Sequence, residues 1–323
     1  MSAITALFIG GNGTISSAVS ALAIERGIDL TLLNRGTDAT RPPIEGARHI
    51  VGDADDLPAL GDYDVVVNWR SFLPSAVASD VSRFAGHTAQ YIYISSASAY
   101  QKPVARLPIT ESTPLRNDFW QYSRDKIASE DVLVAAYRSA GFPATIVRPS
   151  HTYDRTAIVL EGGWTQLDRI RRGEPIVVHG DGTSLWTLTH NTDFARAFVG
   201  LLGNPRAIGE AYTITSDEVL TWDAIAQLYA SALGTTAEIV HVASETIART
   251  IPAWGPGLIG DKAHSVIFDN SKIKALVPDY TAVTPFWKGA RETVDWYLAQ
   301  SSRQAVDAEL NASLDALIAA ASA

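Results

Sequence analysis

The sequence predicts an α/β fold in which a doubly wound parallel sheet is followed by a smaller C-terminal lobe. Two observations lead to this prediction. Between residue 4 and about residue 150, short apolar runs alternate with segments of helical spacing, as in parallel sheets with crossover helices. The first apolar run, at 7–9, ends in Gly10, Gly11 and Gly13 and leads into a helix of small and apolar residues.

The order of elements divides the chain into two parts. A long helix is expected at 120–140, and Gly141 and Pro143 end it. Strands of the sheet are expected at 7–9, 30–33, 65–67, 91–94 and 144–147. Beyond residue 150 the loops lengthen, and the expected elements are strands at 175–178 and 211–214 and helices at 192–202, 221–233 and 285–299. We therefore predict a dinucleotide-binding Rossmann domain at 1–150 and a substrate lobe at 151–323, interleaved with the last sheet elements.

The last segment of the chain, 301–323, is rich in alanine. Val306, Leu310, Leu314 and Leu317 follow one another near helical spacing. This pattern predicts an amphipathic helix that docks on the body of the protein or on a partner subunit.

Composition and charge exclude several classes of protein. The absence of cysteine rules out disulfides and thiolate chemistry. A net charge of −9 argues against nucleic-acid binding. Hydrophobic residues make up 46 % of the chain, but no run approaches the roughly 20 apolar residues that span a bilayer. The N-terminus has no basic region, so we expect no signal peptide, no membrane association and a cytoplasmic protein.

The glycine turn predicts where a dinucleotide would bind. Gly10 allows the tight turn, and Gly13 lets a pyrophosphate approach the backbone where Thr14 and Ile15 open the helix. Ser16 stands where such fingerprints have their third glycine, so we expect slightly looser packing of helix on strand.

Three further positions are candidate cofactor contacts. The second strand ends in Asn34-Arg35, where an acidic residue would favour NAD; the guanidinium of Arg35 instead suits a 2′-phosphate, so NADP(H) is favoured and NAD(H) stays open. Asp53 is placed to accept a hydrogen bond from the adenine amino group. Asn68 ends the strand at 65–67, at the sheet edge where ligands bind.

A tyrosine and a lysine on the long helix are the candidate catalytic pair. Tyr122 and Lys126 are four residues apart and therefore share a helix face. An ammonium group beside a phenol lowers the pKa of the phenol, so we expect Lys126 to favour the phenolate of Tyr122. Ser96 follows the strand at 91–94 at the same sheet edge and can hold a substrate carbonyl oxygen. We predict no metal site.

With these motifs in this order, the chain resembles the extended short-chain dehydrogenase/reductases, in particular the NAD-dependent epimerase/dehydratase group. The resemblance covers nearly the whole length. It implies that Ser96, Tyr122 and Lys126 act together while a hydride is exchanged with the nicotinamide ring. It also implies a homodimer, formed through the long helix and the helix before it.

Departures from the family narrow the substrate. Nucleotide-sugar members carry an Arg-Asp pair after Gly-Asp-Gly, whereas here Trp186-Thr187 follow Gly180-Asp181-Gly182, so the cation that grips a diphosphate is missing. The alternative cations are Arg155, Arg169, Arg171 and Arg172. The family's asparagine after the fifth strand is absent from Arg148-Pro149-Ser150-His151, and His151 is expected to be a hydrogen-bonded loop residue. Ala97-Ser98 replaces the Asp-Glu of dehydratases.

We therefore expect an NADP(H)-dependent oxidoreductase that acts on a carbonyl or alcohol of a small polar or sugar-like substrate. A sugar or nucleotide-sugar epimerase with tightly held cofactor is the alternative within this chemistry. An RNA-binding or cofactor-sensing protein is the alternative of another class, because 33–36 and 148–153 also resemble chloroplast stem-loop RNA-binding proteins.

Overall fold

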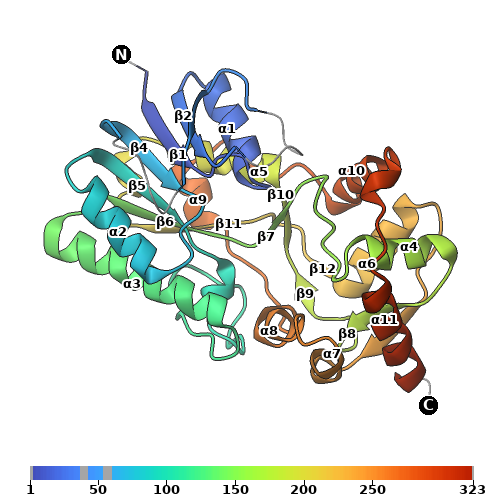
Figure 1. The fold of residues 1–323 in the computed structure, drawn as a ribbon. Coiled ribbons are helices and arrows are strands. Elements are labelled where there is room, and N and C mark those ends of the chain that lie inside the picture. Colours follow the sequence, from blue (N-terminus) through green and yellow to red (C-terminus); the bar gives the residue numbers. More distant parts are fainter. Residues whose placement is uncertain (1–2, 37–42, 54–59, 322–323) are drawn as a thin grey trace.

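One parallel sheet organises the molecule (Figure 1). The computed structural model describes residues 3–36, 43–53 and 60–321. Seven strands, all paired in parallel, lie in the order β11-β6-β5-β4-β1-β2-β3. Their bounds are β1 Thr5–Ile9, β2 Asp29–Asn34, β3 Arg48–Val51, β4 Tyr63–Asn68, β5 Thr88–Ile94, β6 Ala144–Pro149 and β11 Ala211–Ile214. This order is that of a doubly wound sheet, and it confirms the predicted fold class.

Helices cover both faces of the sheet. Along β1, Ala6 and Phe8 face one layer while Leu7 and Ile9 face the other, as alternating side chains of a strand must. The first layer contains α1 (Ser16–Glu25) and α5 (Asn191–Val199), which pack on each other. The second contains α2 (Pro74–Phe84) and α3 (Gln121–Ala140). Gly141, with φ of 66°, ends α3 in the left-handed conformation, as expected from its sequence.

Strand β3 was not among the expected strands. Its sequence, Arg48-His49-Ile50-Val51, has only two apolar residues, and three of its four positions are exposed at the edge of the sheet. An exposed edge strand lacks the apolar run by which the buried strands were recognised.

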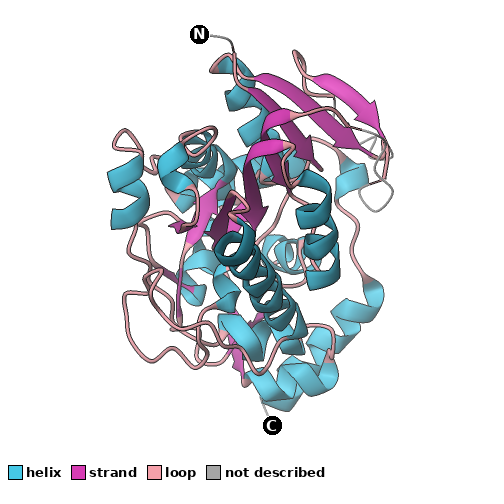
Figure 2. Ribbon diagram, turned by 90° about the vertical axis from the view of Figure 1, so that its left-hand side faces the viewer, coloured by secondary structure: helices cyan, strands magenta, loops and turns pink. Residues whose placement is uncertain are grey.

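The rest of the chain forms the smaller lobe, which lies beyond the carboxyl ends of the strands (Figures 1 and 2). Its strand pairs are β7 with β10, β8 with β13 and β9 with β12. Their bounds are β7 His151–Tyr153, β8 Ile176–His179, β9 Leu185–Trp186, β10 Leu188–His190, β12 Leu220–Thr221 and β13 Ile239–Val242. The helices of the lobe are α4 Trp164–Arg172, α6 Trp222–Ala232, α7 Ser244–Thr250, α8 Gly255–Gly257, α10 Phe286–Leu298 and α11 Ala308–Ala321, whereas α9 Ser271–Leu276 packs on β11 of the sheet.

The C-terminal helix α11 docks on its own chain. Leu314 and Leu317 are buried in a cluster with Val177 of β8 and Val242 of β13. The sequence predicted that this helix docks on the body of the protein or on a partner subunit. In the structure it docks on the body of the protein. Val306 precedes the helix and is 42 % exposed.

The two parts of the chain are interleaved. Strand β11 extends the sheet next to β6, and α5 packs on α1, although both come from beyond residue 150. Gln90 of β5 joins them further, because its side chain donates to the Leu201 carbonyl and accepts from the Gly203 amide. The division at residue 150 stays a prediction, and it does not coincide with the edge of the sheet. Within the described residues, no helix is long and apolar enough to cross a bilayer.

Candidate active site

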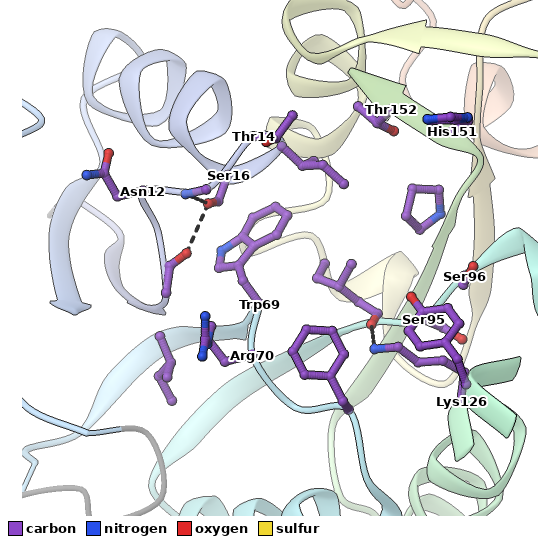
Figure 3. A pocket seen from close by; sticks show the side chains of 18 of the residues that line it. Asn12, Thr14, Ser16, Trp69, Arg70, Ser95, Ser96, Lys126, His151 and Thr152 are labelled. Carbon is purple, nitrogen blue, oxygen red and sulfur yellow. Dashed lines mark hydrogen bonds between the residues drawn. The ribbon is translucent and has the colours of Figure 1, made fainter. Parts of the chain in front are cut away.

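A cavity of about 1000 Å³ lies at the carboxyl ends of the strands. Of the predicted site residues it is lined by Gly10, Gly13, Thr14, Ile15, Asn34, Arg35, Asp53, Ser96, Tyr122 and Lys126. Residues that are more than 100 positions apart in the sequence thus meet at one site, with the glycine turn on one side and Lys126 on the other (Figure 3).

The glycine turn is braced by the serine that replaces the third glycine. The hydroxyl of Ser16 accepts a hydrogen bond from the Gly13 amide at 2.7 Å and donates to the Gly10 carbonyl at 3.0 Å (Figure 3). Gly10 has a φ of 85°, a backbone angle that residues with a side chain rarely adopt. The close approach of helix to strand occurs at Gly11, where an added Cβ would lie 2.5 Å from Leu32 Cδ2. The looser packing expected at Ser16 stays a prediction.

The start of α1 fits an anionic group. Its first turn has no acidic residue, and the N-cap residue Ile15 supplies no side-chain hydrogen bond to the exposed amides. Uncapped amides and the positive end of a helix dipole are typical partners of a phosphate. Asn191, at the start of α5, donates to the Thr14 carbonyl at 2.9 Å and so holds the turn from the second half of the chain.

The ends of β2 and β3 lie side by side at the outer end of the cavity. Asn34 is in register with Val51, and the Gly52 amide donates to the Asn34 carbonyl at 3.0 Å. This pairing brings Arg35 and Asp53 to the same rim. Val51 is 77 % exposed there and offers an apolar surface to a flat ring.

Asn68 is placed elsewhere than predicted. It does not line the cavity; its amide nitrogen donates to Asp80 at 2.7 Å, and its oxygen accepts from the amides of Arg70 and Ser71. The prediction that Asn68 contacts a cofactor is wrong for this side chain, because its polar atoms form the hydrogen bonds of the turn after β4.

That turn instead brings Trp69, Arg70 and Phe72 to the cavity wall. A Cβ on Gly10 would lie 2.4 Å from Cγ of Arg70, so Arg70 extends across the glycine turn. The sequence placed Trp69 at this strand end but carried no signal for Arg70 and Phe72, because their positions follow from the hydrogen bonds of Asn68.

Lys126 is buried beside Tyr122. Its ammonium nitrogen donates to the carbonyls of Ser71 at 3.0 Å and Ile94 at 2.8 Å, and lies 5.7 Å from the centre of the Tyr122 ring (Figure 3). Burial lowers the pKa of Lys126 from its ordinary value to about 7, against a rise caused by Glu130. Two of its donors are committed, which leaves one position of the amine for a ligand.

The pKa of Tyr122 is raised rather than lowered. Burial is the largest cause, Ser96 opposes it through a hydrogen bond, and Asp261 adds to the rise. Lys126 is not among the causes of this shift, and the expectation that it favours the phenolate stays a prediction. The side chain of Tyr122 is a protonated phenol that can donate its proton.

A chain of serines orients Ser96. Ser123 of α3 donates to the hydroxyl of Ser98 at 2.8 Å, and the Ser98 hydroxyl lies 2.9 Å from the Ser96 hydroxyl. The Ser98 amide also donates to Ser96, at 3.1 Å. When the Ser98 hydroxyl is the donor of this pair, both lone pairs of the Ser96 oxygen are used and the Ser96 proton is available to Tyr122, with which Ser96 forms a hydrogen bond. The sequence did not single out Ser98 and Ser123 for this role.

A buried ion pair joins α3 to β6. Glu130, one turn after Lys126 on α3, accepts from Arg148 of β6 through both carboxylate oxygens, at 2.9 and 2.5 Å. Ser95 also donates to Glu130. These bonds tie the end of β5, and hence Ser96, to the helix that carries Tyr122 and Lys126.

At the end of the cavity away from the glycine turn, Lys262 and Asp261 are each paired with a residue of opposite charge. Lys262 pairs with Glu161 at 2.5 Å, and Asp261 pairs with Lys102 at 2.9 Å. The arginines that were considered as substitutes for the missing cation lie outside the cavity lining; they are Arg155, Arg169, Arg171 and Arg172. Arg169 is paired with the exposed Asp315, and Arg171 and Arg172 are paired with the buried Asp168.

Comparison with known proteins gives the same class. The family model described as the NAD dependent epimerase/dehydratase family matches residues 6–215. The structure resembles UDP-glucuronic acid 4-epimerase from Bacillus cereus in complex with NAD, with a TM-score of 0.74 over 92 % of this chain and 99 % of that chain at 16 % identity.

Two curated relatives align over most of the chain. The chain is 29 % identical to a chloroplast stem-loop binding protein of 41 kDa from Arabidopsis thaliana, over 73 % of this chain and 65 % of the plant protein. It thus spans less than two thirds of that relative's length. It is 26 % identical to 2′-dehydrokanamycin reductase from Streptomyces kanamyceticus, over 85 % of this chain and 79 % of the relative.

The parallel sheet, the glycine turn and the cavity at the strand ends are those of the short-chain dehydrogenase/reductase fold. Within that class, the chain belongs to the NAD-dependent epimerase/dehydratase family.

Proposed function

We propose that this protein is an NADP(H)-dependent reductase of a ketone on a small, uncharged, sugar-like substrate. One observation supports it most: the glycine turn, Arg35 and the Ser96–Tyr122–Lys126 group line the same cavity. A dinucleotide laid along this cavity has its phosphates at one end and its reactive ring at the other.

The described residues fit such a dinucleotide. The turn at 10–16 and the start of α1 would hold the pyrophosphate. Arg35 would pair with a 2′-phosphate, Asp53 would accept from the adenine amino group, and Val51 would face the adenine ring. NADP(H) is thus preferred over NAD(H), on the strength of Arg35 and the neutral Asn34 beside it.

The chemistry follows from the protonation states. NADPH, when bound, supplies a hydride to the carbonyl carbon. Ser96 donates a hydrogen bond to the carbonyl oxygen, and Tyr122 gives that oxygen its proton, which completes the alcohol. Because burial keeps Tyr122 protonated, the protein alone is prepared for reduction. Lys126 remains within reach of Tyr122 and can replace the proton it loses.

The charges of the cavity favour an uncharged substrate. A diphosphate needs cations, and Lys262, at the end of the cavity away from the glycine turn, is already paired with Glu161. The relative named 2′-dehydrokanamycin reductase supports a ketone on a sugar ring as the group reduced.

The test uses NADPH and keto derivatives of methyl glucopyranoside, with the ketone placed at each ring carbon in turn. We expect loss of NADPH absorbance with at least one of them, and none with the Tyr122→Phe variant. Interconversion of a nucleotide sugar with no net use of NADPH would instead establish the epimerase. NADPH binding without turnover of any member of the panel would refute the proposal.

RNA binding has less support than reduction. The net charge of −9 opposes attraction to phosphates, although one relative's name states that it binds a stem-loop. A gel-shift assay at low salt with a stem-loop RNA checks this alternative, and we expect no shift.

We also propose that the protein forms a homodimer through α2 and α3. These helices pack on each other at one face of the sheet, and Leu73 and Tyr137, which belong to them or adjoin them, are 52 % and 43 % exposed. Sedimentation velocity measures the oligomeric state directly; a monomer at all concentrations would contradict the dimer.

A further inference from the structure

A histidine lies in the cavity beyond the catalytic group. His151 opens β7, directly after Ser150, and lines the cavity together with Trp186 and Thr187. In Figure 3, His151 lies near Thr152 on the side of Ser96 and Lys126, away from Asn12 of the glycine turn. The sequence suggested only a hydrogen-bonded loop residue at this position.

Trp186 fixes the tautomer of His151. Its indole nitrogen Nε1 donates to Nδ1 of His151 at 3.2 Å. An indole N–H can only donate, so Nδ1 must be the accepting nitrogen and the proton of the neutral ring resides on Nε2. A protonated ring would present two N–H groups and lose the bond to Trp186.

The surroundings also keep the ring neutral. Burial lowers the pKa of His151 to about 3, and the positive charge of Lys262 lowers it further. His151 therefore offers Nε2–H as a fixed hydrogen-bond donor at neutral pH. No described residue accepts a hydrogen bond from Nε2 in the structure.

Thr187 gives an independent sign of a ligand. Its side chain is 1 % exposed, and its hydroxyl oxygen has no hydrogen-bond partner among the described residues. A buried hydroxyl without a partner is costly, and native structures rarely keep one unless something else satisfies it. A hydroxyl group of a bound molecule can both donate and accept, so it is chemically suited to Thr187 and to the Nε2–H of His151.

We propose that His151 and Thr187 form a subsite for a hydroxyl group of the sugar-like substrate, with Trp186 as the positioning residue that keeps Nε2 the donor. The identity of the substrate class rests on the proposed function. Because Lys262 at this end of the cavity is already paired with Glu161, the subsite recognises an oxygen of a polyol through neutral groups of fixed orientation.

The first experiment measures the tautomer without any turnover. The couplings between ring protons and nitrogens of ¹⁵N-labelled protein should show His151 with its proton on Nε2 at neutral pH. In Trp186→Phe, which removes the indole donor, we expect a mixture of the two tautomers. A wild-type ring that is charged, or that has its proton on Nδ1, would overturn the proposal.

The second experiment uses methyl glucopyranoside as the probe, added to the protein with NADP⁺. The His151 ring resonances should shift with a saturable dependence on the glycoside. His151→Phe and Thr187→Val should each weaken binding about tenfold, and His151→Gln, which keeps an N–H donor, should recover part of it. His241→Phe, at an exposed histidine outside the cavity lining, is the matched control and should change nothing.

The two proposals can fail separately. If keto-glycosides are reduced but the His151 resonances do not move with methyl glucopyranoside, the subsite is wrong and the reductase stands. If the glycoside shifts His151 while NADPH is never oxidised, the subsite stands and the proposed reaction is wrong.

Discussion

The two ends of the cavity are built in different ways. At the nucleotide end, the contacts come from a glycine turn, the start of a helix and two side chains on an exposed rim, Arg35 and Asp53. At the chemical end, Ser96, Tyr122 and Lys126 are oriented by buried hydrogen bonds to groups that are distant in sequence. The first end depends on backbone shape and tolerates water, whereas the second depends on fixed protonation states and excludes it.

The comparison predicts that the largest loss of activity comes from the chemical end. Tyr122→Phe removes the proton donor and should lower kcat about 10³-fold. NADPH affinity should stay within about twofold, because the phenol oxygen is not among the groups that would hold the phosphates. Stopped-flow kinetics and fluorescence titration measure the two quantities; a variant that retains full turnover would clear Tyr122 of this role.

The buried ion pair should matter more for stability than any pair on the surface. Glu130→Gln leaves the guanidinium of Arg148 buried without a counter-charge and should cost about 3 kcal/mol of unfolding free energy. Urea unfolding measures this loss. The control is Asp118→Asn, which removes the exposed pair with Arg116 and should cost much less than the loss of the buried pair.

The outer rim should set the choice of cofactor without affecting the chemistry. Arg35→Asp replaces the group that would bind a 2′-phosphate by one that repels it and should lower the preference for NADPH over NADH about tenfold or more. The ratio of kcat/KM values for the two cofactors checks this. An unchanged ratio would mean that another cation, of which Arg70 is the nearest candidate, binds the phosphate.

The last predicted effect is the pH dependence that Lys126 contributes to stability, which is modest within a single pH unit. Its pKa is about 7 in the folded protein and near its ordinary value in the unfolded chain, so the unfolded state binds more protons between those values. The unfolding free energy should therefore rise with pH above about 7, by at most about 1.4 kcal/mol per pH unit. Lys126→Met should remove this rise, and equal slopes in the two proteins would contradict the pKa.

Local signals explain what could be predicted from the sequence. The glycine turn, the Tyr122–Lys126 spacing and the strand before Ser96 are patterns within one or two elements, so the fold class followed from them. The roles of Ser98, Arg148 and Trp186 could not be predicted in this way, because each depends on contacts between elements that the chain brings together only on folding. Asn68 shows the reverse case: its position at the end of a strand was predicted, but its side chain does not line the cavity.

The late position of β11 has a consequence for synthesis of the chain on the ribosome. Strand β6 has all six of its residues buried, yet one of its neighbours, β11, follows about sixty positions later. Until Ala211–Ile214 emerge, the nascent polypeptide therefore presents an open apolar strand edge that can pair with other chains. A chain released early would be prone to aggregate, so chaperone cover is needed most between the emergence of β6 and that of β11.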